Sequence, residues 1–311
     1  MQKQKLILPA LIIPLLFNFV LVTCKANKKA DEERRGPIIE EPRSRTEVKT
    51  VGFNYDEDKL IYELVWSDEF DYEGAPDPKK WTCETGGHGW GNNEIQYYTN
   101  GSNVYVDGSK MIITARLEST GGREVTSTRI RTVKKGDWLY GKIEVCAKVP
   151  QGLGTWPAIW MLPTDWVYGN WPQSGEIDIM EHVGYDPNVL VMSVHTESYN
   201  HAIRTQKSKS VKQQGMTDGF HVYAVEWLPD KIKFFYDGEL QYTYNPVMLK
   251  NDPSYKEWPF DRRFHLLINL AFGGNWGGAR GVNFDILPVT YEIDYVRVYQ
   301  SPEITSLTAG N

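Results

Sequence analysis

Alternating polar and apolar residues recur along most of this chain and predict short β-strands. Residues 142–149 and 231–236 alternate in this way, as strands with one solvent-exposed face do, and residues 110–116 also predict a strand. The pair Asp237-Gly238 suits a tight hairpin turn. No stretch shows a long, capped 3.6-residue periodicity or an alternation of strands with helices. The pattern therefore predicts an all-β fold, either a β-sandwich or a jelly roll.

The N-terminal residues predict export. Two lysines precede an apolar run, residues 6–22, that prolines interrupt. This run is at the lower limit for a membrane span, so residues 1–23 are better explained as a signal peptide. The residues before Cys24 resemble a bacterial lipobox, although Thr23 departs from the usual Gly, Ala or Ser. We expect lipidation at Cys24 and an outer-membrane or cell-surface lipoprotein; the alternative is cleavage and release to the periplasm or medium.

The rest of the chain divides by composition. Residues 24–54 are rich in charged residues and proline and nearly free of aromatic residues, which predicts a disordered tether. An irregular first element of the domain is the alternative for this stretch. Residues 55–300 contain the predicted strands and are expected to form one folded domain, and residues 301–311 are expected to be a C-terminal tail.

Aromatic content and charge narrow the range of functions. The 311 residues include 11 Trp and 18 Tyr, more Trp than a core of this size needs, so some are expected to be functional. The net charge of −6 argues against a nucleic-acid partner, which requires a basic surface, and mildly against a polyanionic substrate. Cys83 and Cys146 could form a disulfide after export or remain free thiols. No Cys-x-x-Cys or His/Cys cluster indicates a transition metal.

Three carboxylates lie within six residues of one predicted strand. Glu176 and Asp178 share a face of a regular strand, whereas Glu181 points the opposite way. A β-bulge at residues 179–180 would place all three on one face. The two glutamates are then roughly 13 Å apart along the strand, and side chains leaning together would bring their carboxyl groups to about 5–6 Å. A retaining glycosidase requires about 5–5.5 Å.

This arrangement predicts a double-displacement mechanism. Glu176 would attack the anomeric carbon, Glu181 would act as acid and then base, and Asp178 would hydrogen-bond between them. Three adjacent negative charges are unfavourable, so at least one pKa must rise. The alternatives for this stretch are a solvated acidic strand face and a site for a hard cation.

Residues 175–181 resemble the active-site signature of glycoside hydrolase family 16 in its bulged form. The likeness covers nearly all of residues 62–300. It implies an all-β, concanavalin A-like jelly-roll sandwich of two curved antiparallel sheets with an open cleft. It also implies an endo-acting retaining hydrolase that cleaves internal β-1,3-glucosidic bonds of laminarin-like β-glucan, with no cofactor for catalysis. Further blocks similar to laminarinase-type members are residues 65–70, 89–98, 155–160, 269–275 and 293–299.

Four tryptophans are candidate sugar-binding residues. Trp156 and Trp160 are an even number apart in a predicted strand, so they share a face, where indole rings can stack on glucose. The alternative is that both belong to the core, and the resemblance favours the cleft. Trp90 and Trp276 lie in glycine-rich loops and are expected at the rim of the cleft.

The resemblance also implies polar contacts. His195, on the next predicted strand, would face the catalytic carboxylates, although a lone strand histidine is often structural. Asn92 and Arg129 would bind sugar on the non-reducing side of the scissile bond, and a surface ion pair is the alternative for Arg129.

A structural calcium is a further expectation from the resemblance. The matching positions are Glu69, Gly108 and Asp294, and calcium prefers oxygen ligands such as backbone carbonyls and carboxylates. The alternative is that Asp294 pairs with Arg297.

Several competing functions remain. A mixed-linkage β-1,3-1,4-glucanase is the nearest, because the same cleft can hold either chain, and agar or carrageenan would call for basic cleft residues. A non-catalytic glycan-binding surface lipoprotein is a further alternative that the presence of both catalytic glutamates disfavours. The expected partner is a β-glucan polysaccharide, with membrane contact only through the N-terminal lipid and with the protein a monomer.

Overall fold

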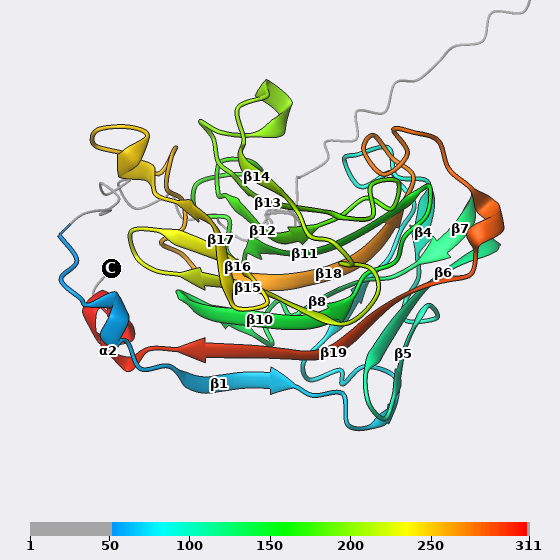
Figure 1. The fold of residues 1–311 in the computed structure, drawn as a ribbon, viewed down its shortest axis with the longest axis horizontal. Helices are drawn as coiled ribbons and strands as arrows, with labels where there is room; N and C mark the ends of the chain where they lie inside the picture. Colours follow the sequence, from blue (N-terminus) through cyan, green and yellow to red (C-terminus); the bar gives the residue numbers. More distant parts are fainter. Residues whose placement is uncertain (1–51, 310–311) are drawn as a thin grey trace, which may run out of the picture. The chain divides into compact units, whose positions relative to one another are not determined.

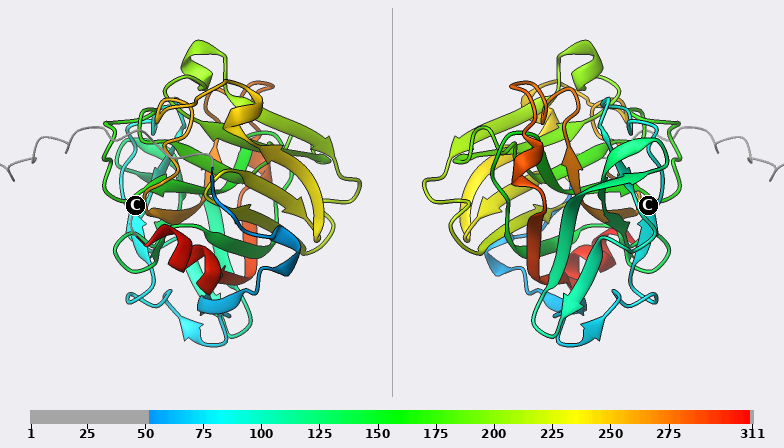
Figure 2. Two further views of the ribbon diagram at one scale, coloured as in Figure 1. Left: turned by 90° about the vertical axis from the view of Figure 1, so that its left-hand side faces the viewer. Right: turned by 90° about the vertical axis from the view of Figure 1, so that its right-hand side faces the viewer.

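A computed structural model describes residues 52–309, so the predicted signal peptide, Cys24 and most of the tether lie outside the described residues. The described chain forms two large sheets stacked face to face, a jelly-roll sandwich, as predicted (Figures 1 and 2). Among these residues, no helix is long and apolar enough to cross a membrane.

One sheet has 11 strands, with the main order β17-β16-β15-β10-β19-β6-β5-β2. β1 and β6 both pair with β19, along different parts of that strand. β7 pairs with β6, and β4 pairs with β7. The β4–β7 pair is parallel, an exception to the predicted antiparallel pairing. The bounds are β1 Glu63–Asp68, β2 Glu73–Gly74, β4 Gln96–Tyr98, β5 Val104–Asp107, β6 Met111–Thr120, β7 Arg123–Ser127, β10 Gly141–Lys148, β15 His221–Trp227, β16 Ile232–Tyr236, β17 Glu239–Tyr244 and β19 Val289–Gln300.

The other sheet has eight strands in the order β14-β13-β12-β11-β18-β8-β3, with β9 also paired to β18. β11 and β18 lie at its centre and pair over nine consecutive residues. The bounds are β3 Thr82–Glu84, β8 Arg129–Arg131, β9 Asp137–Trp138, β11 Thr155–Pro163, β12 Glu176–Glu181, β13 Val189–His195, β14 Lys207–Lys212 and β18 Phe264–Phe272. Short 3-10 turns lie at Glu57–Lys59, His201–Ile203, Pro246–Met248 and Phe284–Ile286.

Strand alternation places the core between the two sheets. In β10, Ile143 and Val145 are fully buried while Lys142 and Glu144 are part-exposed, as predicted from the sequence. The alternation ends at Cys146 and Ala147, which are both buried where the pairing with β19 shifts register. The hairpin at Asp237-Gly238 is also confirmed. Both residues have positive φ, 48° and 80°, as a type I′ turn requires, and they join β16 to β17.

Two expectations are settled outside the sheets. Within the predicted C-terminal tail, Pro302–Thr308 form the helix α2, and its Ile304 is 4% exposed and belongs to the hydrophobic core. Proline in the first turn and apolar Ile304 explain why this segment begins a helix and packs. Cys83 and Cys146 are free thiols, the second of the two alternatives.

Candidate active site

A cleft of about 370 Å³ opens on the outer face of the eight-stranded sheet, opposite the core. β11 shows how alternation builds it: Ala158 and Trp160 line the cleft, whereas Ile159 and Met161, which alternate with them, are fully buried in the core. Strands β8, β12 and β18 and loops around Trp90 and Trp171 supply the remaining walls. Trp156 and Trp160 therefore share the cleft face, as predicted.

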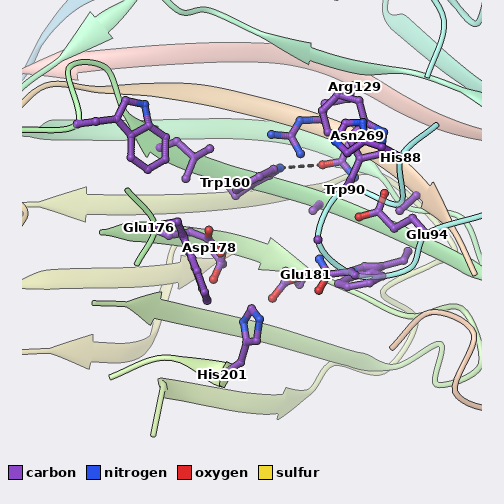
Figure 3. A pocket seen from close by; sticks show the side chains of 18 residues that line it. His88, Trp90, Glu94, Arg129, Trp160, Glu176, Asp178, Glu181, His201 and Asn269 are labelled. Atoms are coloured by element: carbon purple, nitrogen blue, oxygen red, sulfur yellow. Dashed lines mark hydrogen bonds between the residues drawn. The ribbon is translucent and has the colours of Figure 1, made fainter. Parts of the chain in front are cut away.

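A β-bulge on β12 brings the three carboxylates together. Asp178 pairs with Ser193 and Glu181 with Val191, so three steps on β12 face two on β13. Ile179 and Met180 are both buried in the core, at 1% and 0% exposure, where a regular strand would expose one of them. All three carboxylates consequently line the cleft, and the predicted bulge is confirmed (Figure 3).

Burial perturbs the titration of all three carboxyl groups. It raises the pKa of Glu176 to about 8, assisted by the charge of Asp178. It also raises the pKa of Glu181 to about 7, and the pKa of Asp178 well above its usual value. Their proximity means that the protons are shared by the cluster rather than owned by one residue. At neutral pH the cluster therefore retains protons that isolated carboxyl groups would have lost.

His195 faces these carboxylates from β13, directly opposite Glu176 in the strand register. Its Nε2 atom lies 3.2 Å from Asp178 Oδ2 and 3.8 Å from Glu176 Oε1. His195 is 6% exposed, and its ring lies 5.9 Å from that of Trp171. The predicted position of His195 is confirmed.

The two cleft tryptophans are fixed by hydrogen bonds of different kinds. Trp156 donates from Nε1 to Glu181 Oε1 at 3.1 Å, so it touches a candidate catalytic carboxylate directly. Trp160 donates from Nε1 to Asn269 Oδ1 at 2.7 Å, the bond drawn in Figure 3. Trp156 is 8% exposed, which makes it a core-like residue whose edge reaches the cleft.

Arg129 lines the cleft and also forms an ion pair, the alternative that the sequence left open. Its guanidinium lies 4.7 Å from the Trp90 ring and 4.6 Å from the Trp160 ring, and it lines the cleft. Its Nε donates to Glu84 Oε2 at 2.5 Å, an ion pair that holds the guanidinium between the two indoles. Asn92 lines the same part of the cleft.

Trp276 corrects the prediction that it lines the rim. It does not line the cleft but packs edge-on against Trp156, with ring centroids 5.5 Å apart. The two indoles form a small cluster with Val183 and Ala271. Trp276 therefore packs against Trp156 as a part-buried neighbour.

Sequence reasoning missed several residues that line the cleft. Glu94 is 6% exposed, accepts hydrogen bonds from Gln96 and Tyr98, and has its pKa raised by burial. It stands beside Asn92 in one of the quoted blocks, which was the available signal. The others come from loops whose position strand patterns do not encode; they are His88, Trp166, Trp171 and His201.

The three positions expected to bind calcium lie on the other sheet and its turns. The carboxylate of Glu69 accepts from Arg297 Nη2 at 2.7 Å, so Arg297 pairs with Glu69 and not with Asp294. A calcium here would therefore rely on the Asp294 carboxylate and on backbone carbonyls such as those of Glu69 and Gly108. Calcium binding stays a prediction.

Two part-buried glutamates flanking a buried aspartate, in an aromatic-walled cleft on a jelly roll, define a glycoside hydrolase. The chain belongs to the glycosyl hydrolases family 16, whose family model matches residues 89–297. The fold and the bulged carboxylate strand thus agree with the resemblance seen in the sequence.

Relatives within this family are close. The chain is 50% identical over 244 residues to a beta-glucanase from Rhodothermus marinus, covering 77% of this chain and 85% of that protein. The X-ray structure of the laminarinase from Rhodothermus marinus matches with a TM-score of 0.76 and 50% identity, over 78% of this chain and 99% of that one. A non-specific endo-beta-1,3(4)-glucanase of family GH16, SCLam, matches with a TM-score of 0.73 and 40% identity, over 82% of this chain and 100% of that one.

Proposed function

We propose that this protein is an endo-acting β-1,3-glucanase that hydrolyses laminarin-like β-glucan with retention of configuration. The observation that carries the proposal is the bulged β12 strand, which puts Glu176, Asp178 and Glu181 side by side on one cleft wall. The 50% identity to a beta-glucanase and a laminarinase supports the choice of substrate. A cleft open along the surface accommodates internal bonds of a long chain.

In the first step, Glu176 attacks the anomeric carbon while Glu181 gives its proton to the leaving glycosidic oxygen, forming a covalent glycosyl-enzyme. In the second step, Glu181 takes a proton from water, and that water releases the sugar from Glu176. The reactive form therefore holds a proton on Glu181 and leaves Glu176 as the anion, which is one arrangement of the protons that the three carboxyl groups share. His195 opposes the rise in the pKa of both Glu176 and Glu181, so it favours ionisation within the cluster without selecting one glutamate over the other.

Sugar binding in this cleft must rely on stacking and hydrogen bonds, since glucose carries no charge. Trp160 and Trp90 present indole rings on either side of Arg129, and the guanidinium can donate to sugar hydroxyls. Trp156 lies next to Glu181 and would contact the sugar at the bond being cleaved.

The direct test is hydrolysis of laminarin by the wild type, Glu176→Gln and Glu181→Gln, with Glu239→Gln as a control on an exposed strand. We expect both cleft variants to lose hydrolysis while remaining folded, Glu181→Gln by about 10²–10⁴-fold because it removes general acid catalysis. The control should retain full activity. Wild-type protein that cleaves neither laminarin nor barley glucan would refute the proposal.

Mixed-linkage β-1,3-1,4-glucan is the second candidate substrate. The observation that favours it is the 40% identity to a non-specific endo-beta-1,3(4)-glucanase. Initial rates on laminarin and on barley glucan, at equal mass concentration, separate the two: a preference for laminarin supports the first proposal, and a preference for barley glucan supports the second.

Export, lipid attachment at Cys24, a monomeric state and a structural calcium at Glu69, Gly108 and Asp294 belong to the same proposal. The exposed lysines along β14 support the monomer, because charged edge strands resist pairing with another chain. Mass spectrometry of the mature N-terminus tests the lipid, and Cys24→Ala should release the protein from the membrane fraction. Light scattering tests the monomer, and a fall in Tm with EDTA tests the calcium.

A further inference from the structure

Glu176, Asp178 and His195 converge on one point at the wall of the cleft. One ligand atom from each residue lies within 4.8 Å of the others. The His195 Nε2 atom is 3.2 Å from Asp178 Oδ2 and 3.8 Å from Glu176 Oε1. Figure 3 shows the Asp178 side chain pointing into the cleft, next to Glu176.

These separations match the ligand sphere of a small borderline-soft cation. Zinc binds imidazole nitrogen and carboxylate oxygen at about 2.0–2.2 Å in tetrahedral geometry, which places neighbouring ligand atoms about 3.3–3.6 Å apart. The two measured separations bracket this range. Calcium, by contrast, takes six to eight oxygen ligands and does not select an imidazole.

The hydrogen bonding of this cluster leaves one buried oxygen without a partner. Asp178 is 2% exposed, and its Oδ2 atom has no hydrogen-bond partner within residues 52–309. Although His195 Nε2 is 3.2 Å away, the two atoms are not aligned as donor and acceptor. A buried carboxylate oxygen without a partner is costly, and a cation between the two atoms would satisfy it.

We propose that Glu176, Asp178 and His195 form a binding site for Zn²⁺, with the fourth coordination position open to the cleft. The site goes beyond the proposed glucanase activity, whose two steps use only carboxyl groups and water. If the proposed function holds, the ion occupies the nucleophile and blocks the cleft. Zn²⁺ would then be a reversible inhibitor that competes with the polysaccharide.

The surroundings of His195 set the expected affinity. A metal-bound imidazole usually donates its second nitrogen to an acceptor, and loss of that contact costs about 10–100-fold in affinity. His195 Nδ1 has no such partner among the described residues. We therefore expect a dissociation constant in the micromolar range, not the nanomolar range of dedicated zinc sites.

Isothermal titration calorimetry of Zn²⁺ into the metal-free full chain at neutral pH tests the site without any substrate. We expect one ion per chain, and at least tenfold weaker binding for His195→Gln and for Asp178→Asn. Thermal melting without metal checks that each variant is folded, and two different variants guard against one that is not. His221→Gln is the matched control, because His221 also lies beside a carboxylate, 2.7 Å from Asp237, on the other sheet.

The outcomes separate this inference from the proposed function. Binding that is unchanged in both cleft variants, or that is lost in His221→Gln, would overturn the site, as would no binding in the wild type. If binding behaves as expected and laminarin is cleaved, Zn²⁺ should raise KM with kcat unchanged, and EDTA should reverse the effect. If binding behaves as expected but no glucan is cleaved, the zinc site stands and the glucanase proposal fails.

Discussion

The hydrogen bond from Trp156 to Glu181 makes a prediction about the pH dependence of activity. The indole Nε1 donates to Glu181 Oε1 at 3.1 Å, and a donor of this kind stabilises the ionised carboxylate. It therefore lowers the pKa of Glu181, in opposition to burial, which raises that pKa to about 7. Trp156→Phe removes the donor and keeps an aromatic ring against Trp276.

The size of the effect follows from the strength of the lost bond. A hydrogen bond to a charged group contributes about 1.5–3 kcal/mol, and one pKa unit corresponds to about 1.4 kcal/mol. Without the donor, the pKa of Glu181 should rise by about one to two units. As the general acid, Glu181 would then keep its proton to higher pH, so the alkaline limb of the activity profile should move upward by the same amount.

The assay is kcat/KM on laminarin across the pH range, because this quantity reports ionisations of the free enzyme. Trp160→Phe is the control: its Nε1 donates to neutral Asn269, so its alkaline limb should stay in place even if sugar binding weakens. The reasoning is refuted if the limb of Trp156→Phe does not move, or if both variants move equally.

Two further predictions concern stability. The pKa of Glu176 rises from 4.5 to about 8 on folding, so its contribution to stability is present below pH 4.5 and is lost as the pH rises towards 8. Calorimetry should therefore show that Glu176→Gln raises Tm by a few degrees at about pH 8 and by much less at about pH 4.5. Trp156→Ala should lower the unfolding free energy by about 3 kcal/mol or more, because Trp156 is buried against Trp276. Trp160 is part-exposed, so Trp160→Ala should lower Tm less, but it should lower kcat/KM on laminarin by about tenfold or more. Equal losses of Tm in the two variants would contradict this difference between them.

The sequence predicted those features that depend on neighbours along one strand. The buried alternation of β10, the turn at Asp237-Gly238 and the bulge before Glu181 all follow from local patterns, and the structure contains each of them. The bulge was predictable because three carboxylates with apolar residues between them make chemical sense only if they share a face.

Features that depend on loop folding were predicted poorly. Trp276 and Trp90 both lie in glycine-rich loops, yet only Trp90 lines the cleft, because the residues next to either tryptophan do not determine which surface its loop contacts. His201 and Trp171 come from loops that only the assembled sheet brings beside His195. The helix at Pro302–Thr308 was missed because Ile304 finds its buried site on distant parts of the chain.

The stereochemistry of hydrolysis tests the central claim most directly, because the roles of Glu176 and Glu181 depend on a covalent intermediate. Proton NMR of laminarin hydrolysis by the wild type, recorded before mutarotation, identifies the anomer first formed at the new reducing end. The double-displacement mechanism predicts the β-anomer first, with the α-anomer appearing only later. An α-anomer in the earliest spectra would contradict the assignment of Glu176 as nucleophile.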